Sequence, residues 1–135
     1  WQLEGNASYQ ENESDAGQQD IGVAPNWMLK QGISGNWHHT QFGLYANYFS
    51  DPTDPESLNP SVIESNPNPK AYIWATLQVR QSLKPWMGND LWSVRLYVDN
   101  LLNESSYYPE IARKRVNSFP LRERRTFYLM LDYQP

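Results

Sequence analysis

The stretch LWSVRLYVDNLLNESSYY, residues 91–108, alternates apolar and polar side chains over its first nine positions. One side of this alternation carries Trp92, Val94, Leu96 and Val98. Arg95 and Asp99 fall on the other side. A period of two residues is typical of a β-strand with one apolar and one polar face. The Asn-Leu-Leu-Asn sequence that follows predicts a turn, because Asn adopts turn conformations readily.

The same period of two recurs along the chain, and no segment shows a convincing period of 3.6. The predicted strands are residues 1–10, 26–38, 40–49, 70–83, 91–100 and 125–133. Prolines lie in the connections or beside the strands, as expected for a residue that cannot donate to a strand ladder. The connections alternate long and short, which places every long loop at one end. The sequence therefore predicts an all-β fold, an antiparallel up-and-down meander of about six strands.

The predicted strands sort their side chains by polarity. The apolar set runs from Trp1 and Leu3 to Leu131 and Tyr133 and contains no charged residue. Every strand charge falls in the opposite set, namely Glu4, Lys30, Arg80, Arg95, Asp99 and Asp132. We expect Arg80, Arg95, Glu4 and Asp132 to pair with one another or with a further domain. The sheet is thus predicted to have an apolar face and a polar face.

A period of two does not decide whether the apolar face points into a soluble core or toward lipid. Aromatic side chains on that face gather at the strand ends, with small or aliphatic residues between them. Trp27 and Trp37 are ten residues apart, which corresponds to about 25 Å in height for a strand tilted by about 40°. Trp and Tyr favour the membrane interface. We therefore expect a segment of a transmembrane β-barrel, with a soluble β-sheet core as the alternative.

Composition excludes several classes of function. The 135 residues carry a net charge of −4 and no long basic run, so we expect no nucleic-acid partner. The absence of cysteine excludes disulfides and thiolate chemistry. No hydrolase elbow, zinc-protease helix or phosphate loop occurs in the sequence, and we expect neither catalysis nor a cofactor. His38 and His39 are adjacent, so in a strand they would point to opposite faces, and we expect no metal there.

The last 45 residues resemble the C-terminal end of TonB-dependent outer-membrane receptors, which take up siderophores and similar nutrients in Gram-negative bacteria. The run Val98-Asp99-Asn100-Leu101-Leu102-Asn103, followed by Tyr107 and Tyr108, is similar to the end of the family's penultimate strand. The stretch from Arg124 to Tyr133 is similar to its final strand, although the family's usual Gly-Arg pair is absent. The resemblance implies an outer-membrane location and a role in the channel wall.

The resemblance also implies partners. The family's plug domain and its TonB-binding box have no counterpart in these residues, so TonB would act only through regions outside them. Six strands also leave two unpaired sheet edges, which are costly in lipid. We expect the missing strands to come from a longer parent receptor with its plug domain; a second fragment or self-association through the sheet edges are the alternatives. Outer-membrane lipid would cover the apolar face.

Candidate ligand-binding residues lie in the connection 101–124, which combines bases with paired tyrosines. Arginine and tyrosine together suit anionic, aromatic ligands. By resemblance to the family's outer loops, we predict ligand contact at Tyr107, Tyr108, Arg113 and Arg115. The alternative is that these bases meet lipopolysaccharide phosphates or neighbouring acidic loops. A soluble periplasmic or surface module that binds carbohydrate or protein remains the alternative for the whole chain.

Overall fold

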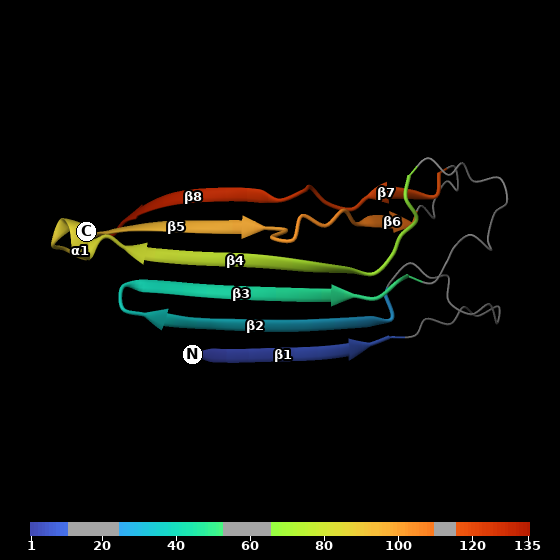
Figure 1. Ribbon diagram of the computed structural model, residues 1–135, viewed down its shortest axis with the longest axis horizontal. Coiled ribbons are helices and arrows are strands. Elements are labelled where there is room, and N and C mark those ends of the chain that lie inside the picture. The colour runs from blue at the N-terminus through green and yellow to red at the C-terminus, as the bar shows by residue number, and fades with distance from the viewer. Residues whose placement is uncertain (11–24, 53–65, 110–115) are drawn as a thin grey trace.

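In a computed structural model, the chain forms one open, six-stranded antiparallel sheet with a small two-stranded sheet at one end (Figure 1). The structure describes residues 1–10, 25–52, 66–109 and 116–135. The elements are β1 (Gln2–Tyr9), β2 (Trp27–Trp37), β3 (Thr40–Phe49), β4 (Tyr72–Ser82), α1 (Lys84–Met87), β5 (Trp92–Asp99), β6 (Tyr107–Pro109), β7 (Ser118–Pro120) and β8 (Thr126–Tyr133). The large sheet has the order β1-β2-β3-β4-β5-β8.

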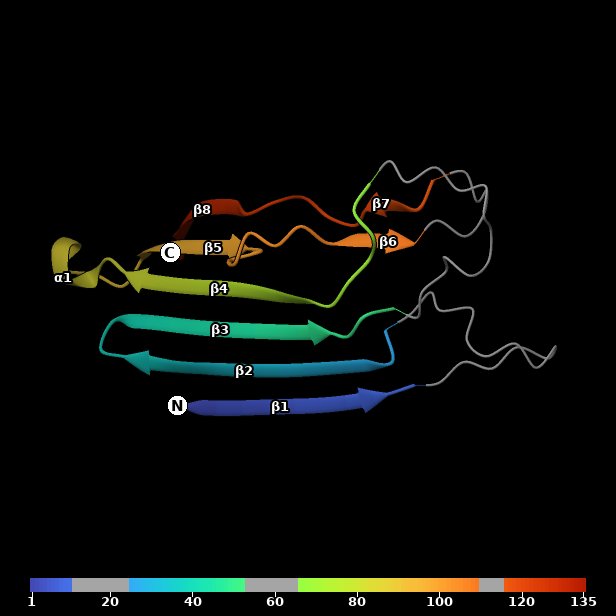
Figure 2. The ribbon, with the colours of Figure 1, turned by 45° about the vertical axis from the view of Figure 1, so that its right-hand side comes forward.

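The meander predicted from the period of two is confirmed, and each of the six long strands begins and ends within two residues of its predicted limits. Neighbouring strands pair in antiparallel register throughout. The strands lie in a single layer, and both chain termini lie at the end of the sheet that carries α1 (Figure 2). We call this the turn end and the opposite end, which carries β6 and β7, the loop end. β1 and β8 form the two edges.

Tight connections at the turn end hold the strands in register. His38 has a φ of 53° in the two-residue turn between β2 and β3, where Trp37 pairs with Thr40. The connection from β4 to β5 contains α1, a single helical turn that the sequence period did not predict. Lys84 forms a 2.7 Å ion pair with Asp90. This hydrogen bond lowers the pKa of Asp90 below its ordinary value.

The Asn-Leu-Leu-Asn sequence forms the predicted turn after β5. Asn100 and Asn103 both have positive φ, 50° and 57°, a region that Asn tolerates better than most residues with a side chain. The Asn100 side chain is fully buried; its Oδ1 accepts from the Glu104 amide at 2.9 Å and its Nδ2 donates to the Glu104 carbonyl at 2.8 Å. Asn100 therefore closes the turn from inside.

A second buried region lies at the loop end, where β6 and β7 form a hairpin that the sequence did not predict. Asn117 and Ser118, both buried, bind the segment that precedes β4. The Asn66 amide donates to Asn117 Oδ1 at 3.1 Å, Asn117 Nδ2 donates back to the Asn66 carbonyl, and Ser118 Oγ donates to the Pro67 carbonyl at 2.7 Å. We call these four residues the loop latch. It joins the connection before β4 to the connection before β8.

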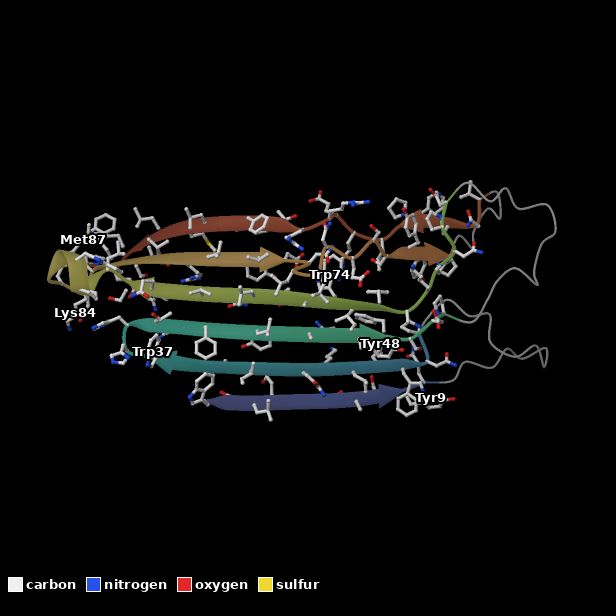
Figure 3. All side chains as sticks on the ribbon, in the orientation of Figure 1. Tyr9, Trp37, Tyr48, Trp74, Lys84 and Met87 are labelled. Atoms are coloured by element: carbon white, nitrogen blue, oxygen red, sulfur yellow. The ribbon has the colours of Figure 1, made fainter. Side chains whose placement is uncertain are left out.

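Much of the apolar face of the large sheet is exposed, although Ala75 and Val98 on it are buried. Leu29 is 37% exposed, Ile73 40% and Leu129 75%, whereas Val94 is half-buried. These residues do not form a core that the polypeptide itself screens from solvent. Aromatic rings occupy both ends of the face, with Tyr9 and Tyr48 at the loop end and Trp37 at the turn end (Figure 3).

Among the described residues, no helix is long and apolar enough to cross a membrane.

Candidate functional site

The polar face of the large sheet carries the charged and amide side chains, and it divides into two regions. Toward the turn end, the register forms a continuous row across four strands from Asn36 through Gln41 and Arg80 to Arg95. The next row toward the loop end is Gln2, Ser34, Gly43 and Gln78. Residues of both rows line a hollow of about 600 Å³, together with Trp1, Phe42 and Val79 from the apolar face. We call it the arginine hollow.

Two arginines dominate the charge of this hollow. Arg80 of β4 and Arg95 of β5 are direct register partners, a placement in which like charges repel each other. Arg80 Nε donates to Ser93 Oγ at 3.0 Å. Arg95 Nη2 lies 3.2 Å from Asp132 Oδ2, with the arginine side chain 42% and the aspartate side chain 28% exposed.

The expected pairing on the polar face is therefore confirmed for Arg95 and Asp132 only. In the described part of the chain, Arg80 and Glu4 have no ion-pair partner. The register explains this result, because Asp132 pairs with Ser93 and lies beside Arg95 on the next strand. Glu4 lies three strands away from Arg80, level with Gly32 and Tyr45.

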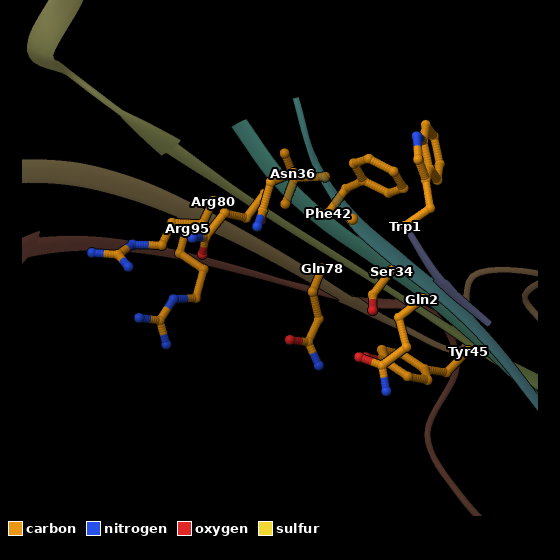
Figure 4. Close-up of a pocket in the computed structure, with 13 residues that line it drawn as sticks. Trp1, Gln2, Ser34, Asn36, Phe42, Tyr45, Gln78, Arg80 and Arg95 are labelled. Atoms are coloured by element: carbon orange, nitrogen blue, oxygen red, sulfur yellow. The ribbon is translucent and has the colours of Figure 1, made fainter. Parts of the chain in front are cut away.

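Tyr45 marks the limit of the hollow toward the loop end. A Cβ atom on Gly32 would meet the Tyr45 ring at 2.6 Å, and one on Gly43 would meet it at 2.8 Å, so both positions require glycine for the ring to lie against the strands. Figure 4 shows Gln2, Ser34, Gln78 and Arg95 on one side of the strands, with Trp1 and Phe42 on the other. Gln2, Ser34 and Gln78 therefore add neutral hydrogen-bonding groups to the side of the sheet that carries Arg95.

The second region of the polar face is an aromatic cluster at the loop end. The Trp74 indole is 5% exposed and donates to Asp99 Oδ1 at 2.9 Å. The Arg122 guanidinium lies 4.9 Å from the centre of a Trp74 ring, within the range of a cation–π contact. Beside them, the Phe49 and Tyr72 rings stack at 4.8 Å. Arg122 therefore fixes the connection before β8 onto the polar face.

The predicted ligand residues are only partly placed. Tyr107 and Tyr108 lie in β6 and pair with Pro120 and Phe119 of β7, with Tyr108 40% exposed. Arg113 and Arg115 lie outside the described residues, so their predicted role stays a prediction. No motif in the sequence marks the aromatic cluster or the arginine hollow as a site. The shared face of Arg80 and Arg95 was visible in the period of two, but their direct opposition depends on the register that the α1 connection sets.

His38 and His39 are both exposed at the tip of their turn, and the Trp37 and His38 rings meet edge to face at 5.1 Å. Across the described ranges, no three His, Asp or Glu side chains are grouped closely enough to hold a metal ion.

Comparisons with protein-family models, with curated proteins and with solved structures give no match for this chain.

Proposed function

We propose that this chain is part of the wall of an outer-membrane β-barrel, the C-terminal barrel segment of a receptor of the TonB-dependent type. Lipid hydrocarbon covers the apolar face, and the polar face lines an aqueous interior. The chain contributes channel wall and outer loops to the uptake of a siderophore or similar nutrient. It performs no covalent chemistry. The plug domain, TonB contact and remaining strands belong to the parent receptor.

The observation that carries this proposal is the exposed apolar face between two rows of aromatic rings. On this face, register row after register row is uncharged, for example Leu3, Ile33, Leu44, Leu77, Val98 and Phe127. All but Leu77 and Val98 of this row are exposed. Tyr9 meets Trp27 at the loop end, with ring centres 4.9 Å apart, and Trp92 meets Tyr133 at the turn end at 4.6 Å. Such rings favour the two membrane interfaces, where apolar rings and polar tips are both satisfied.

The slant of the two aromatic rows supports the same proposal. Phe127 is the loop-end aromatic of β8, and the register places it level with Leu3 of β1. The loop-end aromatic of β1 is Tyr9, six residues further toward the loop end. Trp1 is the turn-end aromatic of β1 and is level with Leu129 of β8. The turn-end aromatic of β8 is Tyr133, four residues further toward the turn end. Over five strand spacings, offsets of this size correspond to strand tilts of about 30° to 40°. Membrane barrels tilt their strands by about 35–45°.

The proposal is tested by the depth of single tryptophans in lipid. The full chain is folded into phosphatidylcholine vesicles as variants that keep one tryptophan, with the others replaced by phenylalanine. We expect lipids brominated near the headgroup to quench Trp27 and Trp37 strongly and to the same degree, because they lie at the two interfaces. Trp74 is the matched control, because it lies in β4 on the polar face, and we expect weak quenching there.

A soluble module with its apolar face in a dimer interface gives a different result. The chain would then remain monodisperse without detergent, and brominated lipid would quench neither Trp27 nor Trp37. That outcome would overturn the membrane assignment and favour the periplasmic or surface binding module.

A further inference from the structure

We propose that the arginine hollow is a binding site for small oxyanions, which are solutes that carry phosphate or carboxylate groups. The inference rests on the proposed function for the location of this binding site, in the aqueous interior near the turn end of the barrel wall. The arrangement of Arg80 and Arg95 does not depend on that position.

Charge balance is the first argument for an anion. The two rows of the hollow contain two guanidinium groups and no carboxylate. Asp132 is the one acidic group in contact with either arginine among the described residues, and it bonds Arg95 through a single 3.2 Å contact. The directly opposed Arg80 therefore adds an uncompensated positive charge, which an anion between the two side chains would offset.

Free donors are the second argument. Ser93 occupies only the Nε–H of Arg80, and the terminal nitrogens of Arg80 have no hydrogen-bond partner in the described part of the chain. Guanidinium groups bind phosphate and carboxylate in a bidentate fork. Gln78 and Gln41 in the same two rows supply neutral amide donors. The hollow therefore presents N–H groups from two neighbouring strands, and its two rows contain no carboxylate that would compete with an anion for them.

The full chain, labelled with ¹⁵N-arginine and folded in dodecyl maltoside micelles, is titrated with inorganic phosphate and with citrate at constant ionic strength. We expect the Nε–H signals of Arg80 and Arg95 to shift together and to saturate. Arg80→Gln should weaken the binding of the preferred anion by about tenfold, the loss expected for a charge-assisted contact. Asp132→Asn should tighten it, because this substitution removes the carboxylate that competes for Arg95.

Lys30→Gln is the matched control, because Lys30 is an exposed cation on the same polar face but lies outside the hollow. We expect it to change the affinity by less than about twofold, since distant exposed charges are screened. Circular dichroism verifies the β content of each variant. If Arg80→Gln does not fold, Arg80→Lys retains the charge without the fork, and a several-fold loss is expected.

The proposal is overturned if neither anion gives saturating shifts at tens of millimolar, or if Lys30→Gln weakens binding as much as Arg80→Gln. The outcome is independent of the tryptophan experiment, which reports on the apolar face. Saturable anion binding without quenching by brominated lipid would place an oxyanion site on a soluble module. Quenching without anion binding would indicate a barrel wall that lacks this binding site.

Discussion

Asn100 connects the sequence pattern to the fold at the scale of a single residue. Its positive φ, its full burial and its two side-chain bonds to Glu104 occur together, and a third bond reaches the Glu123 carbonyl at 3.3 Å. Few residues satisfy all three demands, because glycine lacks the side chain and larger residues do not adopt this backbone conformation readily. The asparagine at this position is therefore required by backbone conformation and hydrogen bonding together.

Asn100→Ala is expected to lower the free energy of unfolding by about 2–4 kcal/mol, because it introduces backbone strain and leaves buried polar groups without partners. Asn100→Gly removes the side chain but tolerates positive φ, so its cost should be smaller by about 1 kcal/mol. Urea unfolding of the two variants in micelles, followed by tryptophan fluorescence, measures both values. Equal stability of the two variants would show that backbone conformation contributes nothing at this position.

Residue identity alone predicted the turn at Asn100 and the shared face of Arg80 and Arg95. It did not predict that Arg80 lacks an acidic partner, because opposition across strands depends on register. The contact of Arg122 with Trp74 could not be predicted from the sequence either. This contact depends on how the connection before β8 folds back onto the sheet, and no periodic pattern in the sequence predicts that conformation.

At the scale of elements, the six long strands were predictable because each alternates over eight or more residues and period two is the strongest local signal of a strand. The elements that the sequence missed are short. β6 and β7 have three residues each and both end in proline, and α1 has four residues. No window of that length contains enough repeats to reveal a period. The loop latch that holds β7 is likewise made of long-range bonds between residues about fifty positions apart.

The loop latch gives a prediction at this scale. Asn117→Asp keeps an acceptor for the Asn66 amide but removes the donor to the Asn66 carbonyl and to Asn68. We expect faster hydrogen exchange in residues 66–70 and 117–120, equivalent to a local loss of about 1–3 kcal/mol. Exchange in β2 and β3 should not change. Asn89→Ala, at an exposed position of the turn end, is the control and should leave exchange at the loop end unaltered.

The latch prediction fails if Asn117→Asp leaves exchange at the loop end as it is in the unmodified chain. It also fails if the whole sheet exchanges faster, because the latch would then support the strands and not the loop end alone.

At the scale of the whole molecule, the sheet is a single layer, and Trp74, Ala75 and Val98 are the only buried hydrophobic side chains among the described residues. Among the described residues, the largest fully buried side chains are Asn100, Pro109 and Ser118. All three lie at the loop end of the sheet. Leu3 is 81% exposed and Leu131 63% exposed. Under the proposed function, lipid supplies the apolar environment that such exposed aliphatic side chains favour. The two edges β1 and β8 require further strands in such an environment.

In the proposed barrel wall, successive residues of each strand alternately face hydrocarbon and water. The natural absence of cysteine allows this claim to be measured directly, with single cysteines at positions 29, 30, 33 and 34 of β2. The full chain is folded into vesicles and treated with a water-soluble maleimide. We predict that Leu29→Cys and Ile33→Cys react slowly and that Lys30→Cys and Ser34→Cys react quickly. Equal reactivity at all four positions, or fast reaction at Leu29→Cys and Ile33→Cys, would contradict the account.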